Sequence, residues 1–494
     1  MEQSSVPSTA QEPLPPDVDD VPFSTARLSH SEFTYSIPLT AGPKFVRFHF
    51  YPTSYQGFDD PSSTKAFFSV KAGHFTLLGN FSALLHAQGQ PTVVKEFFVN
   101  INESQRLNIT FTPSLDILDS YAFINGIEIV SMPLDLYHGS TVNEYGITFL
   151  GQSQGILYTL GNDSAMEKLY RVNIGGIRPI TGREDTGMYR YWEDDSNYLV
   201  MEYPRPALPF NYSIDLNFIK IPSYSAPREV YATARSMGPN KTHNENYSLT
   251  WEFSVDSGFY YFVRLHFCEF QIEITMEGDR VFEILIANLT AATPADVIAW
   301  SGGRGIPIYR DYVVAIGAKG NLKQQNLSIA LHPAPAWRTL YSDAILNGIE
   351  IFKISHANFN LAGPNPDPIP NRLENMKPPI GESGKNKPPI GQSDWAKHCY
   401  DNGTLDQTID PYLEGKISTQ SLLKFGEVAI NCLAAEGSKR PAMSEVVCGL
   451  ELALQLQEIN EVNPISDESH LHDSTVNDYH VLFTSGSGSM NVGR

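Results

Sequence analysis

Apolar and polar residues alternate along most of the chain before residue 356. Residues 45–50 read Phe-Val-Arg-Phe-His-Phe, so that the polar Arg47 and His49 alternate with apolar side chains. This period of two places one face of a strand in a core. Asn-Gly pairs at 125–126 and 347–348 lie between apolar runs, a strong hairpin signal because both residue types tolerate positive φ. Short strands separated by Gly, Pro and Asn turns predict a mainly β chain built from antiparallel β-sandwiches.

An internal repeat divides this β region into two copies. Four motifs recur in the same order: Thr-Ala-Arg at 25–27 and 233–235, Phe-Val-Arg at 45–47 and 262–264, the segments 107–113 and 327–333, and the segments 122–129 and 344–351. Chance explains one such pair, whereas four collinear pairs indicate two homologous domains.

The two copies differ at their N-terminal ends. The second copy opens with Leu-Tyr-Arg-Val-Asn-Ile-Gly-Gly at 169–176, and nothing before Thr25 resembles this segment. We therefore expect the first sandwich to lack its opening strand and to expose an unpaired strand edge.

The composition changes after residue 356. Prolines become frequent, and Lys-Pro-Pro-Ile-Gly occurs at both 377–381 and 387–391, which predicts an extended linker. Farther on, apolar residues such as Leu422 and Phe425 follow helical spacing, and Ser444 can cap a second helix. The predicted organisation is a disordered N-terminus (1–20), a sandwich without its opening strand (21–140), a second sandwich (141–356), a Pro-rich linker (357–393), a small helical region (394–458) and a disordered tail (459–494).

Charge and composition exclude several classes of protein. The 494 residues contain 35 Lys+Arg and 55 Asp+Glu, a formal net charge of -20, which disfavours nucleic acid as a partner. Four cysteines are too few for a disulfide scaffold, and we expect no metal and no cofactor. The N-terminus lacks the basic and apolar regions of a signal peptide. No window approaches ~18 consecutive apolar residues, so we predict no membrane span in this chain.

Acceptor motifs for N-glycosylation are nevertheless dense. Such a cluster is typical of a chain that evolved for the secretory route, which conflicts with the absence of a recognisable signal. The predicted glycosylation sites are Asn80, Asn102, Asn108, Asn162, Asn211, Asn240, Asn246, Asn288 and Asn326, with Asn402 far downstream.

Two blocks of sequence resemble one family. The segment 169–176, the run Asp-Thr-Gly-Met-Tyr at 185–189 and the Asn-Gly-Ile-Glu-Ile hairpins resemble the tandem malectin-like ectodomain of FERONIA-like plant receptor kinases. Asp-Trp-Ala at 394–396 and Arg-Pro-Ala-Met at 440–443 resemble the last helices of the kinase C-lobe in the same group. The resemblance implies two malectin-like sandwiches and a kinase C-lobe remnant. It also implies a plasma-membrane or extracellular location, although the missing signal leaves the location of this chain open.

The same resemblance implies what the chain binds and what it does not catalyse. Family ectodomains are associated with cell-wall carbohydrate, small secreted signalling peptides and a glycolipid-anchored co-receptor. Family kinases use a Gly-rich loop, a strand Lys, a catalytic-loop Asp and Asn, and a D-F-G Asp, and this sequence contains none of these. We therefore expect a receptor-like binding protein that is not an enzyme. The alternative is a partial copy of a membrane-bound receptor Ser/Thr protein kinase.

Candidate ligand contacts come from aromatic loops. Sugar rings present apolar faces ringed by hydroxyl groups, so their sites combine flat aromatic rings with carboxylates or amides. The alternative is that these aromatics only cover the open ends of the sandwiches. Three clusters fit the first description: Tyr51, Tyr55 and Phe58 with Asp59; Tyr189, Tyr191 and Trp192 with Glu193 and Asp194; and Trp300, Arg304, Tyr309 and Arg310 with Asp311. The last loop, which is basic and aromatic, is also a candidate peptide contact.

Cys268 presents a similar choice between function and packing. Arg264 and His266 are expected on its strand face and could lower the pKa of its thiol. A structural thiol or an orphaned disulfide partner is the preferred interpretation over a nucleophile, because nothing nearby resembles a catalytic arrangement.

Overall fold

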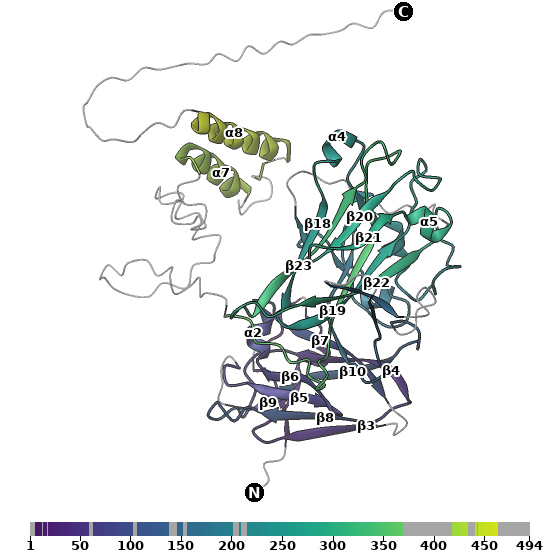
Figure 1. Ribbon diagram of the computed structural model, residues 1–494. Coiled ribbons are helices and arrows are strands. Elements are labelled where there is room, and N and C mark those ends of the chain that lie inside the picture. The colour runs from purple at the N-terminus through teal and green to yellow at the C-terminus, as the bar shows by residue number, and fades with distance from the viewer. Residues whose placement is uncertain are drawn as a thin grey trace, which may run out of the picture. The chain divides into compact units, whose positions relative to one another are not determined.

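The computed structural model forms two compact units, residues Met1–Arg372 and Leu373–Arg494, which are described separately (Figure 1). The described residues are 5–11, 13–16, 18–58, 63–101, 106–137, 146–151, 156–200, 207–208, 215–368, 417–432, 440–441 and 443–462.

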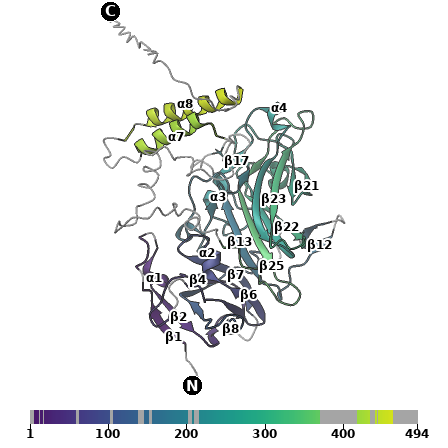
Figure 2. The same ribbon diagram turned by 90° about the vertical axis from the view of Figure 1, so that its left-hand side faces the viewer.

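One ten-stranded sheet runs through both sandwiches of the first unit. Its order is β10 (Gly126–Ser131), β4 (Gly42–Phe50), β7 (Val93–Ile101), β13 (Met166–Asn173), β25 (Gly348–Ile354), β19 (Phe259–Phe267), β22 (Ile308–Ile316), β11 (Ile147–Leu150) and β12 (Leu157–Tyr158), with β14 (Glu193–Asp194) paired to β13. β13 pairs antiparallel with β7 of the first sandwich and with β25 of the second (Figure 2). This single strand therefore joins the two sandwiches through backbone hydrogen bonds.

A second layer covers each half of this sheet. In the first sandwich its order is β3 (Phe33–Pro38), β8 (Arg106–Pro113), β5 (Phe68–Ala72) and β6 (Phe75–Phe81). In the second it is β15 (Leu199–Val200), β18 (Leu249–Asp256), β23 (Gln324–Pro333), β20 (Phe282–Ile286) and β21 (Leu289–Ala295). The expected mainly β fold of two sandwiches is confirmed.

Two small sheets show the internal duplication directly. β1 (Val6–Thr9), β2 (Thr25–Ser29) and β9 (Ala122–Ile124) form one, and β16 (Ala207–Leu208), β17 (Ala234–Ser236) and β24 (Ile345–Leu346) form the other. The middle strand β2 begins with the first Thr-Ala-Arg motif, and the middle strand β17 begins at the alanine of the second Thr-Ala-Arg motif. The short helices in this unit are α1 (Asp20–Phe23), α2 (Ala83–Ala87), α3 (Arg228–Ala232), α4 (Lys241–Asn244), α5 (Val297–Ser301) and a 3-10 turn, η1 (Gly182–Glu184).

Each sandwich encloses its own core, as the alternating pattern predicts. β18 shows the reason: Leu249, Trp251, Phe253 and Val255 are buried while the residues between them are less so, because successive side chains point to opposite faces. A third apolar cluster contains side chains from both sandwiches, among them Phe45, Phe98, Tyr137, Phe262 and Phe352. The two sandwiches thus share buried surface as well as a sheet.

The structure changes two of the expected boundaries. Val6–Thr9 forms β1 and pairs with β2, so part of the N-terminal segment predicted to be disordered is a strand. Residues 357–368, predicted as linker, return to the first sandwich, where Leu361 is buried in its core. The Leu361 amide donates to the Thr76 carbonyl at 2.9 Å, and the Thr76 amide donates to the Phe359 carbonyl at 3.0 Å. Composition alone missed this because Pro-rich segments can pack without forming regular structure.

The second unit contains two described helices, α7 (Thr419–Cys432) and α8 (Met443–Val462). They form a hairpin in which the Ser421 hydroxyl donates to the Ala453 carbonyl at 2.8 Å and the Ser418 amide donates to the Gln457 side chain at 2.8 Å. The helices predicted near Leu422 and Ser444 are therefore present. The rest of the predicted linker, most of the tail and residues 394–416 lie outside the described residues. None of the described helices is both long enough and apolar enough to cross a membrane.

We predict that Gly175→Ala lowers the free energy of unfolding by at least about 3 kcal/mol. Gly175 has φ +74°, and an added Cβ would lie 2.2 Å from the Ala234 carbonyl oxygen. Gly187→Ala is the matched control, since its φ is +88° but no atom lies within 4 Å of the added Cβ. The control is expected to lose only about 1 kcal/mol. Urea unfolding measures both, and equal losses would contradict the close approach.

Candidate ligand-binding site

A chain of buried charges crosses from one sandwich to the other at β13. Arg171 on β13 donates through Nε to Glu350 on β25 and through Nη2 to Glu96 on β7, both at 2.9 Å. Arg47 on β4 donates to the other oxygen of Glu96 at 2.6 Å and to Glu128 on β10 at 2.8 Å. Acidic and basic side chains therefore alternate across five consecutive strands of the sheet, β10, β4, β7, β13 and β25.

Glu96 and Glu350 remain ionised although they are buried. Burial opposes ionisation of Glu96, but Arg171 and Arg47 together lower its pKa to about 2. Burial likewise opposes ionisation of Glu350, and its hydrogen bond from His266 and the charge of Arg171 hold the pKa of Glu350 well below the usual range. A buried charge without a partner is costly, so each member of the series depends on its neighbours.

His266 occupies a defined protonation state at the end of this series. Burial lowers the pKa of His266 even though Glu350 lies beside it, so the ring is neutral near pH 7. Its Nε2 is 3.1 Å from the Glu350 carboxylate, which can only accept, and its Nδ1 is 2.8 Å from the Tyr231 hydroxyl. The proton therefore lies on Nε2, and Nδ1 accepts from Tyr231.

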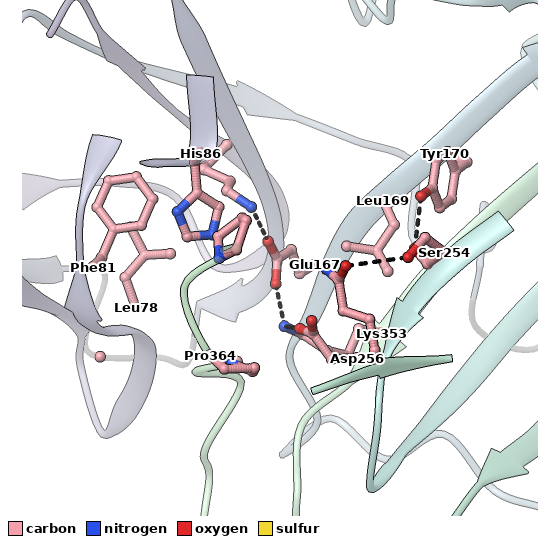
Figure 3. A pocket seen from close by; sticks show the side chains of 15 residues that line it. Leu78, Phe81, His86, Glu167, Leu169, Tyr170, Ser254, Asp256, Lys353 and Pro364 are labelled. Atoms are coloured by element: carbon pink, nitrogen blue, oxygen red, sulfur yellow. Dashed lines mark hydrogen bonds and ion pairs between the residues drawn. The ribbon is translucent and has the colours of Figure 1, made fainter. Parts of the chain in front are cut away.

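A polar cavity of ≈ 210 Å³ lies at the junction of the two sandwiches. Figure 3 shows Phe81 and His86 of the first sandwich on one side and Tyr170 with Asp256 of the second on the other. The segment that contains Pro364 passes between them. The junction thus supplies a small, partly open and mainly polar space.

The charges that line this cavity neutralise one another. Glu167 on β13 accepts from Lys95 at 2.9 Å and from Lys353 at 2.6 Å, and Lys353 also contacts Asp256 at 2.8 Å. Burial opposes ionisation of Glu167, but the two lysines lower its pKa to about 2. Because every charge has a partner, the cavity suits a small neutral polar ligand better than an ion.

Glycine allows the returning segment to cover the cavity closely. A Cβ on Gly363 would lie 2.0 Å from an Asp256 carboxylate oxygen, so the backbone of this segment rests directly on the Lys353–Asp256 pair. Asn365 continues the contact by donating to the Asn80 carbonyl at 2.6 Å and accepting from the Ser82 amide at 3.0 Å. The segment thus forms one wall of the cavity and packs against both sandwiches.

The first predicted aromatic cluster is mostly core. Tyr51 and Tyr55 are buried, and the Tyr55 hydroxyl donates to the Tyr51 carbonyl at 2.7 Å. Phe58 is half-buried and stacks on His30 with ring centroids 5.1 Å apart. Phe58 also borders a hollow of ≈ 670 Å³, so it alone of these three offers surface beside a cavity. Asp59 lies outside the described residues.

The second cluster divides between surface and core. Tyr189 and Tyr191 are 57% and 47% exposed, whereas Trp192 is 0% exposed. The Trp192 ring packs edge-on against His266 with centroids 5.5 Å apart. Arg190 forms a buried bidentate pair with Asp185, with both distances 2.9 Å. The buried Arg190 fixes the loop so that its two neighbouring tyrosines point outward.

The third cluster is also mixed. Tyr309 is buried beneath Arg264, whose guanidinium carbon lies 3.7 Å from the ring centroid. The guanidinium carbon of Arg310 lies 4.7 Å from the centroid of the Trp300 ring, and both side chains are half-buried. Arg304 is exposed and donates to the Ile272 carbonyl at 2.9 Å. Since a fully buried ring cannot touch a surface ligand, the candidate contacts narrow to Tyr189, Tyr191, Arg304 and the partly open Phe58, Trp300 and Arg310.

The described sequons all lie on the surface. This group comprises Asn80, Asn108, Asn162, Asn240, Asn246, Asn288 and Asn326. Asn102, Asn211 and Asn402 lie outside the described residues. Surface position is what an attached glycan requires, so these seven remain predicted glycosylation sites.

The sequence pattern did not reveal the charged residues at the junction. Arg47, His49 and Glu128 belong to repeated motifs, and their counterparts Arg264, His266 and Glu350 do as well. That recurrence was the available signal, because a polar residue that only faces solvent has little reason to recur in both copies.

Reactive chemistry has little support at these sites. Burial and the neighbouring Glu269 raise the pKa of the Cys268 thiol, which makes it an unreactive structural residue. Among the described residues, no group of three His, Cys, Asp or Glu side chains could hold a metal ion. The charged residues of the junction pair with one another.

Known proteins share this architecture. The malectin-like domain family matches residues 3–354. The receptor-like protein kinase FERONIA of Arabidopsis thaliana is 46% identical over 363 residues, which cover 72% of this chain and 38% of FERONIA. ANXUR1 of the same species is 36% identical over 378 residues, which cover 75% of this chain and 42% of ANXUR1. The chain thus spans about two fifths of the length of these relatives.

Solved structures give the same result. The crystal structure of the plant receptor-like kinase FER matches with a TM-score of 0.66 and 44% identity, over 74% of this chain and 91% of that chain. A crystal structure of the plant peptide RALF23 in complex with FER and LLG2 matches with a TM-score of 0.66 and 42% identity, over 74% of this chain and 93% of the matched chain.

Fold and sequence together define a tandem malectin-like β-sandwich domain. The chain belongs to the malectin-like domain family, in the group that contains the receptor-like kinases FERONIA and ANXUR1.

We predict that Arg171→Met lowers the free energy of unfolding by about 3–5 kcal/mol, because Glu96 and Glu350 lose a shared buried cation. Arg178→Met is the control, since the Arg178–Glu184 pair is exposed and such pairs contribute about 1 kcal/mol or less. Urea unfolding measures both. Adding Glu96→Gln and Glu350→Gln to Arg171→Met should recover part of the loss, and a loss no larger than the control would refute the shared-cation role.

We also predict that the first unit loses stability as the pH falls from 6.5 to 4. Burial and Lys95 lower the pKa of His86 in the folded protein to about 4. In the unfolded chain the same histidine has a pKa near 6.5, so as the pH falls it binds a proton in the unfolded state before it does in the folded state. One such group changes the unfolding free energy by at most about 1.4 kcal/mol per pH unit. His86→Gln can still donate to the Ser82 carbonyl, which now lies 3.1 Å from Nδ1, and it should flatten the slope. An unchanged slope would contradict this prediction.

Proposed function

We propose that this chain acts as a ligand-binding ectodomain that takes a small secreted peptide of the RALF23 type together with a glycolipid-anchored co-receptor of the LLG2 type. The observation that supports it is the similarity, at 42% identity and a TM-score of 0.66, to the complex of FER with RALF23 and LLG2. The match covers 93% of that chain, so the elements of the relative's ectodomain have counterparts here.

The proposed contacts lie on loops of the second sandwich. Tyr189 and Tyr191 are exposed on a loop that Arg190 fixes from beneath, and a rigid loop loses little conformational entropy on binding. Arg304 adds an exposed cation on the other candidate loop of the second sandwich. Aromatic and arginine side chains are enriched at the centres of protein interfaces.

Cell-wall polysaccharide is the second candidate ligand. Tyr191 is exposed and lies two and three positions before the carboxylates of Glu193 and Asp194, which is the pairing of flat ring and hydrogen-bond acceptor that sugars need. Support is narrower than for the peptide, because Tyr51, Tyr55, Trp192 and Tyr309 are committed to packing.

We propose no phosphoryl transfer for this chain. The relatives are receptor-like kinases, but the family match ends at residue 354, and the Gly-rich loop, catalytic-loop and D-F-G motifs are absent from the sequence. The helices α7 and α8 fit the proposed C-lobe remnant. A partial copy of a membrane-bound receptor Ser/Thr kinase is the corresponding alternative, and its ectodomain would bind in the same way.

We predict that the purified chain binds RALF23 in the presence of LLG2, and that Tyr191→Ala combined with Arg304→Ala weakens this binding at least about tenfold, or 1.4 kcal/mol. Biolayer interferometry with immobilised peptide measures it. Lys71→Ala, an exposed change on β5 of the first sandwich, is the matched control and should bind normally. Two results together would identify polysaccharide instead of peptide as the ligand. The chain would not bind RALF23 in the presence of LLG2, and pectin fragments would retain the unchanged chain but not the double variant.

A further inference from the structure

The junction cavity has walls from three separate parts of the first unit. The first sandwich supplies Phe81 and His86, which face Tyr170 and Asp256 of the second sandwich in Figure 3. The returning segment supplies the third wall, which includes Pro364. A molecule in this cavity would therefore contact both sandwiches and the returning segment at once.

The returning segment is held to both sandwiches beside the cavity. The Asp367 carboxylate pairs with Lys323 of the second sandwich, and the Asp367 carbonyl accepts from the Gln88 side chain of the first at 3.3 Å. The segment also lies directly on Gly79, where an added Cβ would be 2.8 Å from the Cβ of Ala362. Because these contacts fix the third wall in place, the cavity is formed before any ligand binds, which lowers the cost of binding.

The charged side chains that line the cavity sum to zero. Lys95 and Lys353 balance Glu167 and Asp256, and ion pairs join the four in one continuous chain. An ionic ligand would have to separate one of these pairs or remain unpaired itself, and a partly buried charge without a partner is costly. A neutral ligand requires neither change.

Several polar atoms in the walls have unused hydrogen-bonding capacity. The Lys95 ammonium has three donors, and one is used within the charged chain. The His86 Nδ1 lies 3.1 Å from the Ser82 carbonyl, which only accepts, so the proton lies on Nδ1 and Nε2 is an acceptor. Asp256 uses Oδ2 for Lys353. Among the described residues, neither the His86 Nε2 nor the Asp256 Oδ1 has a hydrogen-bond partner.

Apolar rings and the size of the cavity restrict the ligand further. Phe81 packs against His86 with ring centroids 4.6 Å apart, and Pro364 and Pro366 add apolar surface. The cavity volume of ≈ 210 Å³ is below the range of roughly 300–1,000 Å³ that is typical of pockets for drug-sized ligands. One small ring suits this space better than a peptide or a polysaccharide chain.

We propose that the junction cavity binds one small neutral polyol, a single ring that carries several hydroxyl groups. Each hydroxyl group both donates and accepts, so such a ring can accept from Lys95 and donate to His86 and Asp256. Its C–H face lies against Phe81. This site is separate from the surface loops of the second sandwich that are proposed for peptide and polysaccharide.

The test uses the full chain with myo-inositol and D-glucose as probes, and isothermal titration calorimetry measures binding. Both neutral probes should bind saturably. D-glucuronate and D-glucosamine should each bind at least about tenfold more weakly, because their added charge finds no free countercharge in the cavity. Cellobiose, which has two sugar rings, should also bind at least about tenfold more weakly, because the space holds one ring.

Two substitutions in the walls test the assigned contacts. Lys95→Met removes the spare donor while Glu167 keeps its bond from Lys353, and His86→Phe keeps a flat ring but removes the acceptor. Each should weaken myo-inositol binding at least about fivefold. Lys71→Met is the matched control, since Lys71 is exposed on β5, and it should bind normally. Thermal unfolding without the probe confirms that each variant is folded.

The third wall is tested separately. Hydrogen exchange of amides in residues 360–366 should slow when myo-inositol binds, because a ligand that binds only the folded arrangement stabilises it. Gly79→Ala should weaken binding, since its added Cβ displaces Ala362 and with it the returning segment.

Several outcomes would overturn the proposal. Absence of saturable binding for both neutral probes at tens of millimolar would exclude a polyol site. Equal or tighter binding of either charged probe would exclude a neutral ligand, and equal or tighter binding of cellobiose would replace the single ring by the end of a sugar chain. Normal binding by both Lys95→Met and His86→Phe would place the probe elsewhere. None of these results depends on RALF23, whose proposed contacts lie on surface loops.

Discussion

The first unit depends on one buried guanidinium between two carboxylates. Arg171 contacts Glu96 of one sandwich and Glu350 of the other from a strand that pairs with both. In a medium of low polarity such an arrangement holds only when all of its members are in place. Separation of the two sandwiches would leave ionised groups uncompensated on both sides. The junction therefore fixes their relative position more firmly than apolar contact alone, which tolerates sliding.

Duplication followed by divergence gives the two sandwiches different surroundings. In the second copy the proposed contacts lie on loops, where Tyr191 and Arg304 reach solvent. In the first copy β10 is the last strand of the sheet among the described residues, whereas its counterpart β25 lies between β13 and β19. Two copies of one domain thus present two different kinds of surface.

Sequence patterns predicted the strands well and the site poorly. Alternation around Arg47 and His49 identified β4, and the repeat located its counterpart β19, because period and order survive divergence. The same alternation implied that Arg47 faces solvent, yet its guanidinium is buried against Glu96. A period of two separates the faces of a strand but does not say what covers the second face. The prediction that Trp192 contacts a ligand was weak for a related reason: the preceding Tyr191 is exposed, but the Trp192 ring packs against His266, a residue distant in the chain.

The returning segment determines how the molecule responds to mechanical load. The chain leaves the second sandwich at β25, yet Leu361 is embedded in the core of the first. Tension applied beyond residue 368 is therefore taken up first by this anchor and by the Asn365 contacts with Asn80 and Ser82, and not by β25. Pulling on the C-terminal side would peel the cover from the junction cavity before it sheared either sheet.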